Sequence, residues 1–273
     1  MPADSRRING PEKSISPYAF SKPCKDIKIT EPSLQRKDGR NPDNIRPIFL
    51  KTGLITQAQG SAYIEQDGTK VICSVYGPRA VIRKEEFSMQ GQLTCDFKFT
   101  TFSCHNRRQY QQDAEEKDFS VQLLEALEPA VLLHKFPKAQ VNIMVTVLQN
   151  DGSVLAASVT CASVALADAG IEMYDLVIGS SARISGATIL MDPCATEEYS
   201  DKDSAHVNNG SVTVGLMPSL NQISAVTSKG ELEFEHLNKA MKHCVSMCVD
   251  LYPVCQQALA VAMETRINAD PKT

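Results

Sequence analysis

One continuous stretch, Leu148 to Gly170 (LQNDGSVLAASVTCASVALADAG), constrains the fold of this chain more than any other. Before it, apolar and polar residues alternate over 141–148, which predicts a half-buried strand. An Asp-Gly turn then leads into a run of small residues that predicts a helix over 153–169. We expect Ser153 to cap the start of this helix and Gly170 to close its end. The sequence thus predicts a strand that leads straight into a helix.

The start of such a helix is a common anion site, because unpaired amide groups and the helix dipole point there. Here the first helical side chains are Val154 and Leu155, and we expect no positive charge at this helix start. Arginine is the residue that binds phosphate bidentately, so its absence bears on phosphate chemistry. A second helix, expected over 119–135, follows an acidic run that includes Glu115 and Glu116. We therefore expect an enzyme-like scaffold whose helix starts bind no phosphate.

The rest of the chain predicts a mixed α+β fold. Strands are expected over 62–66, 70–76, 92–99, 176–182, 187–191, 211–217 and 222–226. An Asp67-Gly68 turn predicts that the first two form a hairpin. A last helix should begin near Leu232 and run toward Arg266. We expect a break near Pro253, since an interior proline costs about 3 kcal/mol.

Three regions differ in composition. Residues 1–45 are rich in Pro, Ser, Lys and Asp and predict a basic, mostly extended or disordered arm, followed by one folded domain over 46–267 and a short tail over 268–273. Through Arg46 the chain has ten Lys and Arg against six Asp and Glu, although its total net charge is −4. A solvated tail and a segment that binds RNA or a partner explain the arm equally well. The overall negative charge argues against a polycation that coats nucleic acid.

The nine cysteines are scattered and include no CxxC pair. No secretory signal and no apolar run long enough to cross a bilayer are recognisable, which predicts reduced thiols in a cytosolic or nuclear protein. Cys244 and Cys248 lie one helical turn apart beside His243, a spacing compatible with a metal site. Packing of both thiols into a core is the more typical arrangement, so we expect no metal and no cofactor.

An acidic cluster follows the strand expected at 187–191. Its members are Asp192, Glu197, Glu198, Asp201 and Asp203. Carboxylates clustered at a strand end can bind a divalent cation or supply a general acid. A solvated acidic turn is the more common explanation of such a run. The sequence contains no Walker loop, GxGxxG, GxSxG or HExxH, so nucleotide hydrolysis, dinucleotide redox chemistry and serine hydrolysis have no support.

A basic and aromatic loop follows the strand expected at 92–99. Together with the last two strand residues, the segment contains Lys98, His105, Arg107 and Arg108 interleaved with Phe99, Phe102 and Tyr110. Basic groups can neutralise phosphates while aromatic rings stack on bases. The loop is therefore a candidate RNA-binding segment, with a solvated surface loop as the alternative.

Four stretches of this chain together resemble the RNase PH family. They occur in the family's order between Arg46 and about Pro253: RPIFLKTGLITQAQGSAYIEQDGTKVICSVYGPR, VNIMVTVLQNDGSVLAASVTCASVALADAGIEMYDLV, ILMDPCATEE and VTVGLMPSLNQIS. The turn with its alanine-rich helix is the most specific of them. The resemblance implies an RNase PH-like α+β fold (ribosomal protein S5 domain 2-like), with two βαβ-type halves in one compact domain.

Within the family, the chain resembles the non-catalytic ring subunits of the eukaryotic RNA exosome. The resemblance implies a six-membered ring of RNase PH-like subunits assembled from heterodimers, with RNA passing through a central channel. It also implies S1/KH cap proteins and a separate associated nuclease as partners. The expected location is the nucleus and nucleolus, and also the cytoplasm, with no membrane partner.

The resemblance also assigns site residues. Active members place a phosphate-binding arginine just after the turn, where this chain has Leu155, and a second one where this chain has the acidic run 115–118. Their two catalytic carboxylates match Asp192 and Glu198, although the family has aspartate at the latter position. The resemblance therefore implies a degenerate site without catalysis.

The basic loop lies where active relatives approach the channel mouth, which implies RNA-binding roles for Lys98, Arg107 and Arg108. Two alternatives remain open at this stage. The chain could be an active phosphate-dependent 3'–5' exoribonuclease, or a stand-alone protein of unrelated function that is stable as a monomer.

Overall fold

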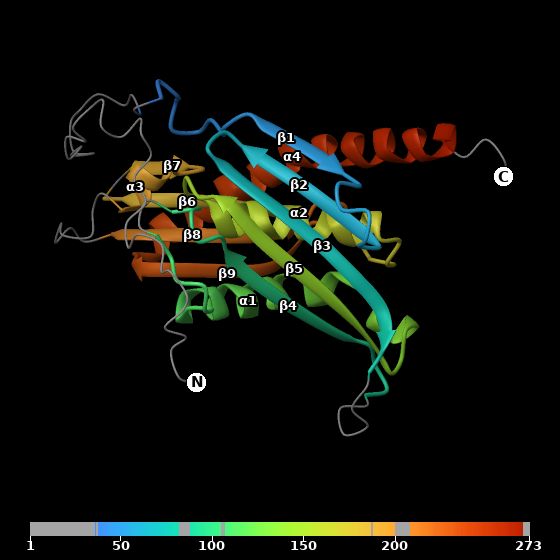
Figure 1. Ribbon diagram of the computed structural model, residues 1–273. Coiled ribbons are helices and arrows are strands. Elements are labelled where there is room, and N and C mark those ends of the chain that lie inside the picture. Colours follow the sequence, from blue (N-terminus) through green and yellow to red (C-terminus); the bar gives the residue numbers. More distant parts are fainter. Residues whose placement is uncertain are drawn as a thin grey trace, which may run out of the picture.

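The computed structural model describes Arg36 and residues 38–81, 88–104, 107–186, 188–199 and 208–269. Two sheets enclose a central helix (Figure 1). The first sheet has the strand order β1-β2-β3-β5-β4, with β1 (Ile48–Thr52), β2 (Gly60–Gln66), β3 (Thr69–Ala80), β4 (Gln92–Phe99) and β5 (Ala139–Gln149). The second has the order β7-β6-β8-β9, with β6 (Ile178–Ser185), β7 (Thr188–Met191), β8 (Asn209–Met217) and β9 (Gln222–Glu231). The expected mixed α+β fold is confirmed.

The first sheet follows the sequence pattern closely. Strands β2 and β3 form the expected hairpin around Asp67, which adopts φ +50°. Strand β4 buries Phe97 and Phe99 and exposes Lys98, so its predicted alternation is correct. It pairs with β5 in parallel, whereas the other neighbours in this sheet are antiparallel. These strands turn most of their apolar residues toward the interior helix, and the core therefore lies on that side, whereas Phe49 of β1 and Met144 of β5 are exposed.

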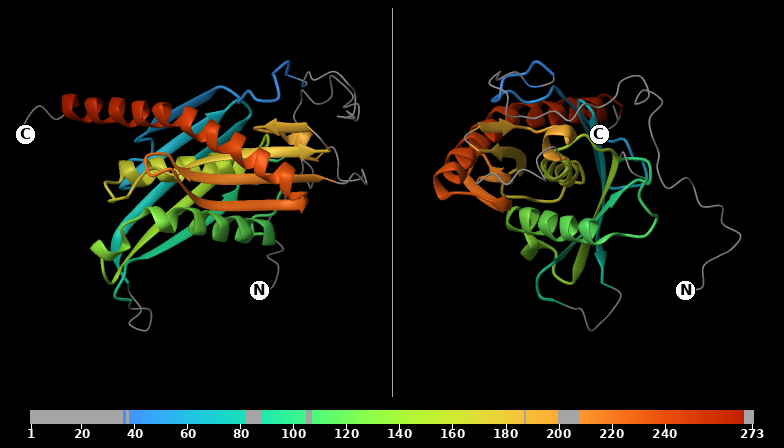
Figure 2. Two further views of the ribbon diagram at one scale, coloured as in Figure 1. Left: turned by 180° about the vertical axis from the view of Figure 1, so that it is seen from behind. Right: turned by 90° about the vertical axis from the view of Figure 1, so that its left-hand side faces the viewer.

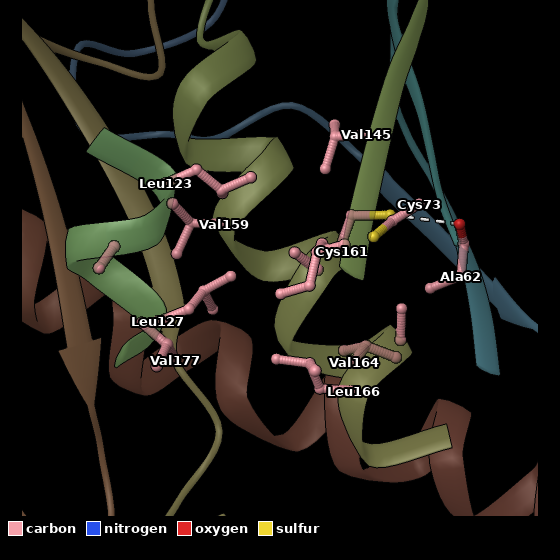
Figure 3. Packing of buried hydrophobic residues seen from close by; sticks show 14 of the residues in the cluster. Ala62, Cys73, Leu123, Leu127, Val145, Val159, Cys161, Val164, Leu166 and Val177 are labelled. Atoms are coloured by element: carbon pink, nitrogen blue, oxygen red, sulfur yellow. Dashed lines mark hydrogen bonds between the residues drawn. The ribbon is translucent and has the colours of Figure 1, made fainter. Parts of the chain in front are cut away.

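The central helix α2 (Val154–Asp168) explains the run of small residues. It lies between the two sheets (Figure 2) and contacts β2 and β3 on one side and β6 on the other. A Cβ atom at Gly60 would lie 2.3 Å from the backbone nitrogen of Ala169, and one at Gly179 would lie 2.3 Å from the carbonyl oxygen of Ala156. Figure 3 shows Cys161 of α2 donating to the carbonyl oxygen of Ala62. Larger residues on either face would separate the sheets.

Helix α1 differs from its prediction. It spans Ala114–Leu127 rather than 119–135, and two short 3-10 turns, Glu128–Ala130 and Leu133–Lys135, follow it. The start is earlier because the Glu116 side chain accepts the Asp113 backbone N–H across 2.8 Å. The end is earlier because Pro129 has no N–H to continue the helical ladder.

Helix α4 (Phe234–Ala269) is one continuous helix, so the predicted break near Pro253 is wrong. Leu251 and Cys255, on either side of the proline, are both buried in the core. Ending the helix at Pro253 would expose one of them, and their burial offsets the lost hydrogen bond. Cys244 and Cys248 are also buried, as expected for core thiols, and the Cys248 thiol donates to the Ile178 carbonyl oxygen.

The same helix overturns a second expectation. By length and composition alone, Phe234–Asn268 is apolar enough to cross a membrane, contrary to the prediction that no such run exists. Only 22% of its most apolar window is buried. One such helix is weak evidence for a membrane span, and α4 packs on β6 and β8, where Cys244 and Cys248 are buried.

The division into an arm over 1–45, a domain over 46–267 and a tail over 268–273 stays a prediction, because most of the arm lies outside the described residues. The part that is described packs against the second sheet. The Met191 backbone N–H, at the end of β7, donates to the Pro42 carbonyl oxygen across 2.8 Å. Arg36 is 7% exposed.

Candidate functional site

The two acidic positions of the expected degenerate site do meet at the start of α2. Asp192 follows β7, Glu198 lies in the short helix α3 (Ala195–Tyr199), and Ser153 precedes α2. Figure 1 shows β7 and α3 at the end of the molecule where α2 begins. The approach is close, since a Cβ atom on Gly152 would lie 2.4 Å from the Pro193 carbonyl oxygen. The turn before α2 and the segment after β7 thus pack backbone against backbone.

The prediction that no positive charge lies at this helix start is wrong. Arg46 is 1% exposed, and its guanidinium reaches the turn from more than one hundred residues upstream. Its Nε and Nη2 donate to the Asp192 carboxylate at 2.9 and 2.7 Å. Its Nη1 donates to the Asp151 carbonyl oxygen at 2.8 Å and to the Thr69 hydroxyl at 3.2 Å, and Nη2 also donates to the Gly152 carbonyl oxygen at 3.3 Å.

A guanidinium has five N–H donors, and these contacts use all five. Arg46 therefore has no donor left for an external phosphate, although its charge lies at the helix start. It serves instead as the counter-charge of a buried carboxylate. Burial by itself would raise the pKa of Asp192, but the hydrogen bonds and charge of Arg46 outweigh burial and hold this pKa below its ordinary value. Asp192 is consequently ionised at neutral pH and poorly suited to donate a proton.

Ser153 does not cap α2 in the expected way. It adopts φ +54°, and its hydroxyl lies 2.5 Å from the Ser181 hydroxyl and 3.2 Å from the Pro193 carbonyl oxygen. Its backbone N–H donates instead to the Glu198 carboxylate at 3.2 Å. An internal carboxylate thus occupies one of the amide donors where an external anion would bind. Leu155, the position matched to the family's arginine, is 9% exposed and adds no polar group.

Glu198 is half-buried, and burial raises its pKa above the ordinary value despite the opposing contact with Ser153. Because the pKa of Glu198 is higher in the folded than in the unfolded protein, its ionised carboxylate lowers the stability of the folded protein at a pH above the folded-state pKa. This loss of stability disappears as the pH falls below the unfolded-state pKa.

We expect Glu198→Gln to stabilise the protein at neutral pH by about 1 kcal/mol, because glutamine keeps an oxygen for the Ser153 N–H and removes the buried charge. Urea unfolding at several pH values measures this effect, and the advantage should fade as the pH falls toward 4. The matched change Glu125→Gln, at an exposed site of α1, should have no effect at any pH. An equal gain in both variants would contradict the assignment to Glu198.

A second buried arginine, which the sequence reasoning also missed, holds the neighbouring acid. Arg36 donates from Nε and Nη2 to the Glu197 carboxylate at 2.9 and 2.6 Å. Its remaining donors reach the carbonyl oxygens of Met191, Asp192 and Asn44 at 2.7, 2.9 and 3.3 Å. Arg36 of the arm and Arg46, at the start of the predicted domain, thus both bind the acidic segment after β7. Asp201 and Asp203 lie outside the described residues. The part of the chain that the structure describes contains no group of three His, Cys, Asp or Glu side chains that could bind a metal ion.

The three predicted RNA-binding residues lie near one another but differ in availability. Lys98 is exposed on β4, and its Nζ donates to the Tyr110 carbonyl oxygen at 3.0 Å. Arg107 is half-exposed, whereas the Arg108 side chain is only 16% exposed and pairs with Glu115 at 2.8 Å. His105 lies outside the described residues. The start of α1 thus does have an arginine beside it, but Glu115 neutralises that arginine.

The fold and this site together define the class of protein to which the chain belongs. Residues 44–172 match the model of the 3' exoribonuclease family, domain 1, and the chain belongs to the RNase PH family. Among individual proteins, human exosome complex component MTR3 (Homo sapiens) is 38% identical, over 97% of this chain and 98% of its own length. The expected family resemblance is confirmed.

Two solved structures show the same fold. Rice (Oryza sativa) Rrp46 superposes with a TM-score of 0.73 at 22% identity, covering 82% of this chain and all of that one. A chain of the Archaeoglobus fulgidus exosome with RNA bound to the active site gives a TM-score of 0.69 at 20% identity, covering 80% and 91%.

Proposed function

We propose that this chain is a non-catalytic structural subunit of an RNA exosome core ring. In this role it completes a ring of RNase PH-like subunits, helps to form the central RNA channel, and supports 3'–5' RNA processing and degradation. The observation that carries the proposal is its similarity to an exosome component along nearly the whole length of both chains. S1/KH cap proteins and a separate nuclease are the further partners, and the nucleus, nucleolus and cytoplasm are the expected locations.

The geometry at the start of α2 supports the lack of catalysis. Phosphorolysis needs inorganic phosphate bound beside the scissile bond by charged, forked donors. Leu155 has no hydrogen-bond donor in its side chain, and all donors of the Arg46 guanidinium bind groups within the protein. The Glu198 carboxylate accepts the Ser153 N–H. Loss of even one such contact costs several kcal/mol of transition-state stabilisation, or on the order of a thousandfold in rate. The acids alone do not make a phosphorolytic site.

An exposed apolar surface supports the structural role. A groove of about 530 Å³ lies between β1 and the C-terminal half of α4, and its lining includes Leu50, Val254 and Val261. Within this lining, Val261 is 54% exposed. Exposed apolar surface of this kind usually faces a neighbouring subunit. A protein that functions as a monomer has no need for such an exposed apolar groove.

We expect Val261→Glu to prevent ring assembly while leaving the thermal melting temperature of the isolated chain within about 2 °C, because an exposed side chain contributes little to folding. Co-expression with RNase PH-like exosome subunits followed by size-exclusion chromatography measures assembly. The matched change Val121→Glu places the same charge on α1 at a valine that is 53% exposed, and should assemble normally. A wild-type chain that stays monomeric beside its partners would reject the ring proposal.

An active phosphate-dependent 3'–5' exoribonuclease is the second candidate, and the two acids at the family's catalytic positions are the observation that favours it. We expect the pure protein, given single-stranded RNA, phosphate and magnesium, to release no nucleoside diphosphate above background. We also expect Leu155→Arg to release none, because the one arginine described beside the start of α1, Arg108, is paired with Glu115. Thin-layer chromatography of the products decides, and diphosphates from the wild-type chain would establish the enzyme instead.

A further inference from the structure

The loop over 100–113, between β4 and α1, exposes two large aromatic side chains. Phe102 and Tyr110 are each 63% exposed. Lys98 precedes the loop and Arg107 lies within it, so both rings belong to a segment with positive charge. Exposed rings beside cations are the combination that single-stranded nucleic acid requires, because every base has a face that can stack.

Arg108 differs from Arg107 because its guanidinium is bound by other groups of the protein. Its guanidinium carbon lies 4.1 Å from the centroid of the Phe99 ring, and its Nε donates to the Cys104 sulfur at 3.2 Å. Its Nη2 donates to Glu115 at 2.8 Å, and Nη1 lies 3.8 Å from the Asp113 carboxylate. Arg108 therefore joins β4, the loop and the first turn of α1. Among the described residues, no such ion pair or ring contact holds Arg107.

The backbone of the loop is fastened at two further places. The Arg108 N–H donates to the Thr101 carbonyl oxygen at 3.1 Å, which brings the neighbouring residues Phe102 and Arg107 to the same part of the loop. The Asn150 N–H, at the end of β5, donates to the Ser103 carbonyl oxygen at 2.9 Å. The contact between Lys98 Nζ and the Tyr110 carbonyl oxygen holds the second ring beside β4.

We infer that Phe102 and Tyr110 stack on the bases of single-stranded RNA, that Arg107 and Lys98 contact its phosphates, and that Arg108 is a positioning residue that holds the loop. This inference rests on the proposed function, since the ring brings RNA past this chain, and it reassigns Arg108 from the RNA contact expected from sequence. A duplex keeps its bases stacked on one another, so the surface selects single strands.

The test uses the assembled ring, a fluorescein-labelled oligoadenylate and a duplex RNA of equal length, with affinity measured by fluorescence anisotropy over a range of salt. The double variant Phe102→Ala/Tyr110→Ala should weaken single-strand binding at least about tenfold without changing its salt dependence. Arg107→Ala should lower the slope of log affinity against log salt by about 0.7, the value for one phosphate contact on a single strand. The matched change Lys242→Ala, at an exposed lysine of α4 outside the groove, should leave both quantities unchanged.

Arg108→Lys separates positioning from contact. Lysine keeps the charge but not the forked geometry, so a direct phosphate contact would leave the salt slope, the melting temperature and the amide exchange of the loop unchanged. A positioning role predicts weaker binding with an unchanged salt slope, a lower melting temperature and faster hydrogen exchange of the Arg108 amide. Wild-type affinity in the double aromatic variant, or wild-type affinity in Arg108→Lys, would overturn the inference. If no ring forms, the proposed function fails, and the same titrations on the isolated chain still decide the role of the loop.

Discussion

Replacing Arg46 with methionine is expected to lower the free energy of unfolding by about 3–5 kcal/mol, because it leaves the buried Asp192 carboxylate without its partner. Methionine has a similar length, so the loss reports on charge rather than on a cavity. The carboxylate would keep only weaker partners, such as Arg40 at 3.6 Å. Urea unfolding followed by circular dichroism at pH 7 measures the change.

The dependence of this loss on pH has a definite sign. The pKa of Asp192 is depressed in the folded protein, so its stabilising contribution is complete above the unfolded-state pKa and is lost as the pH falls through the folded-state value. The gap between wild type and Arg46→Met should therefore narrow in acid. Adding Asp192→Asn to the variant removes the unpaired charge and should recover part of the loss at pH 7. A double variant no more stable than the single one would show that the buried charge is not the cause.

Replacing Gly152 with alanine is expected to cost about 3–5 kcal/mol, from a strained backbone and an overpacked contact acting together. Gly152 has φ +85°, a conformation that costs a residue with a side chain about 1 kcal/mol. In addition, the new Cβ would lie 2.4 Å from the Pro193 carbonyl oxygen and 2.7 Å from the Cys194 carbonyl carbon. These are backbone atoms, so the whole segment after β7 must move.

Gly170 provides the matched control. It has φ +74°, and nothing lies within 4 Å of the position a Cβ atom would take. Gly170→Ala should therefore cost only the backbone strain of about 1 kcal/mol. Equal losses in the two variants would show that the close approach at Gly152 can relax. Thermal unfolding of both variants under the same conditions gives the comparison.

Local patterns predicted most of the elements. The Asp67-Gly68 turn located the hairpin, the alternation over 92–99 gave the buried face of β4, and the small residues over 153–169 located α2. Each pattern depends on residues that are neighbours along the chain, so periodicity is enough to recognise it. The predicted break at Pro253 was wrong because distant packing outweighed the local penalty.

At the candidate site, the sequence by itself determined that the family's phosphate-binding arginines are missing, because it has the apolar Leu155 at one helix start and acidic residues at the other. It also gave the acidic pair Asp192 and Glu198. Only the tertiary structure decided that Arg46 reaches this place, uses every donor it has and leaves none for a ligand. The physical reason is that an ion pair between residues 146 positions apart has no spacing or period in the sequence. Its partners are set by how β1, α2 and β7 pack, and a composition count cannot separate a buried counter-charge from a free one.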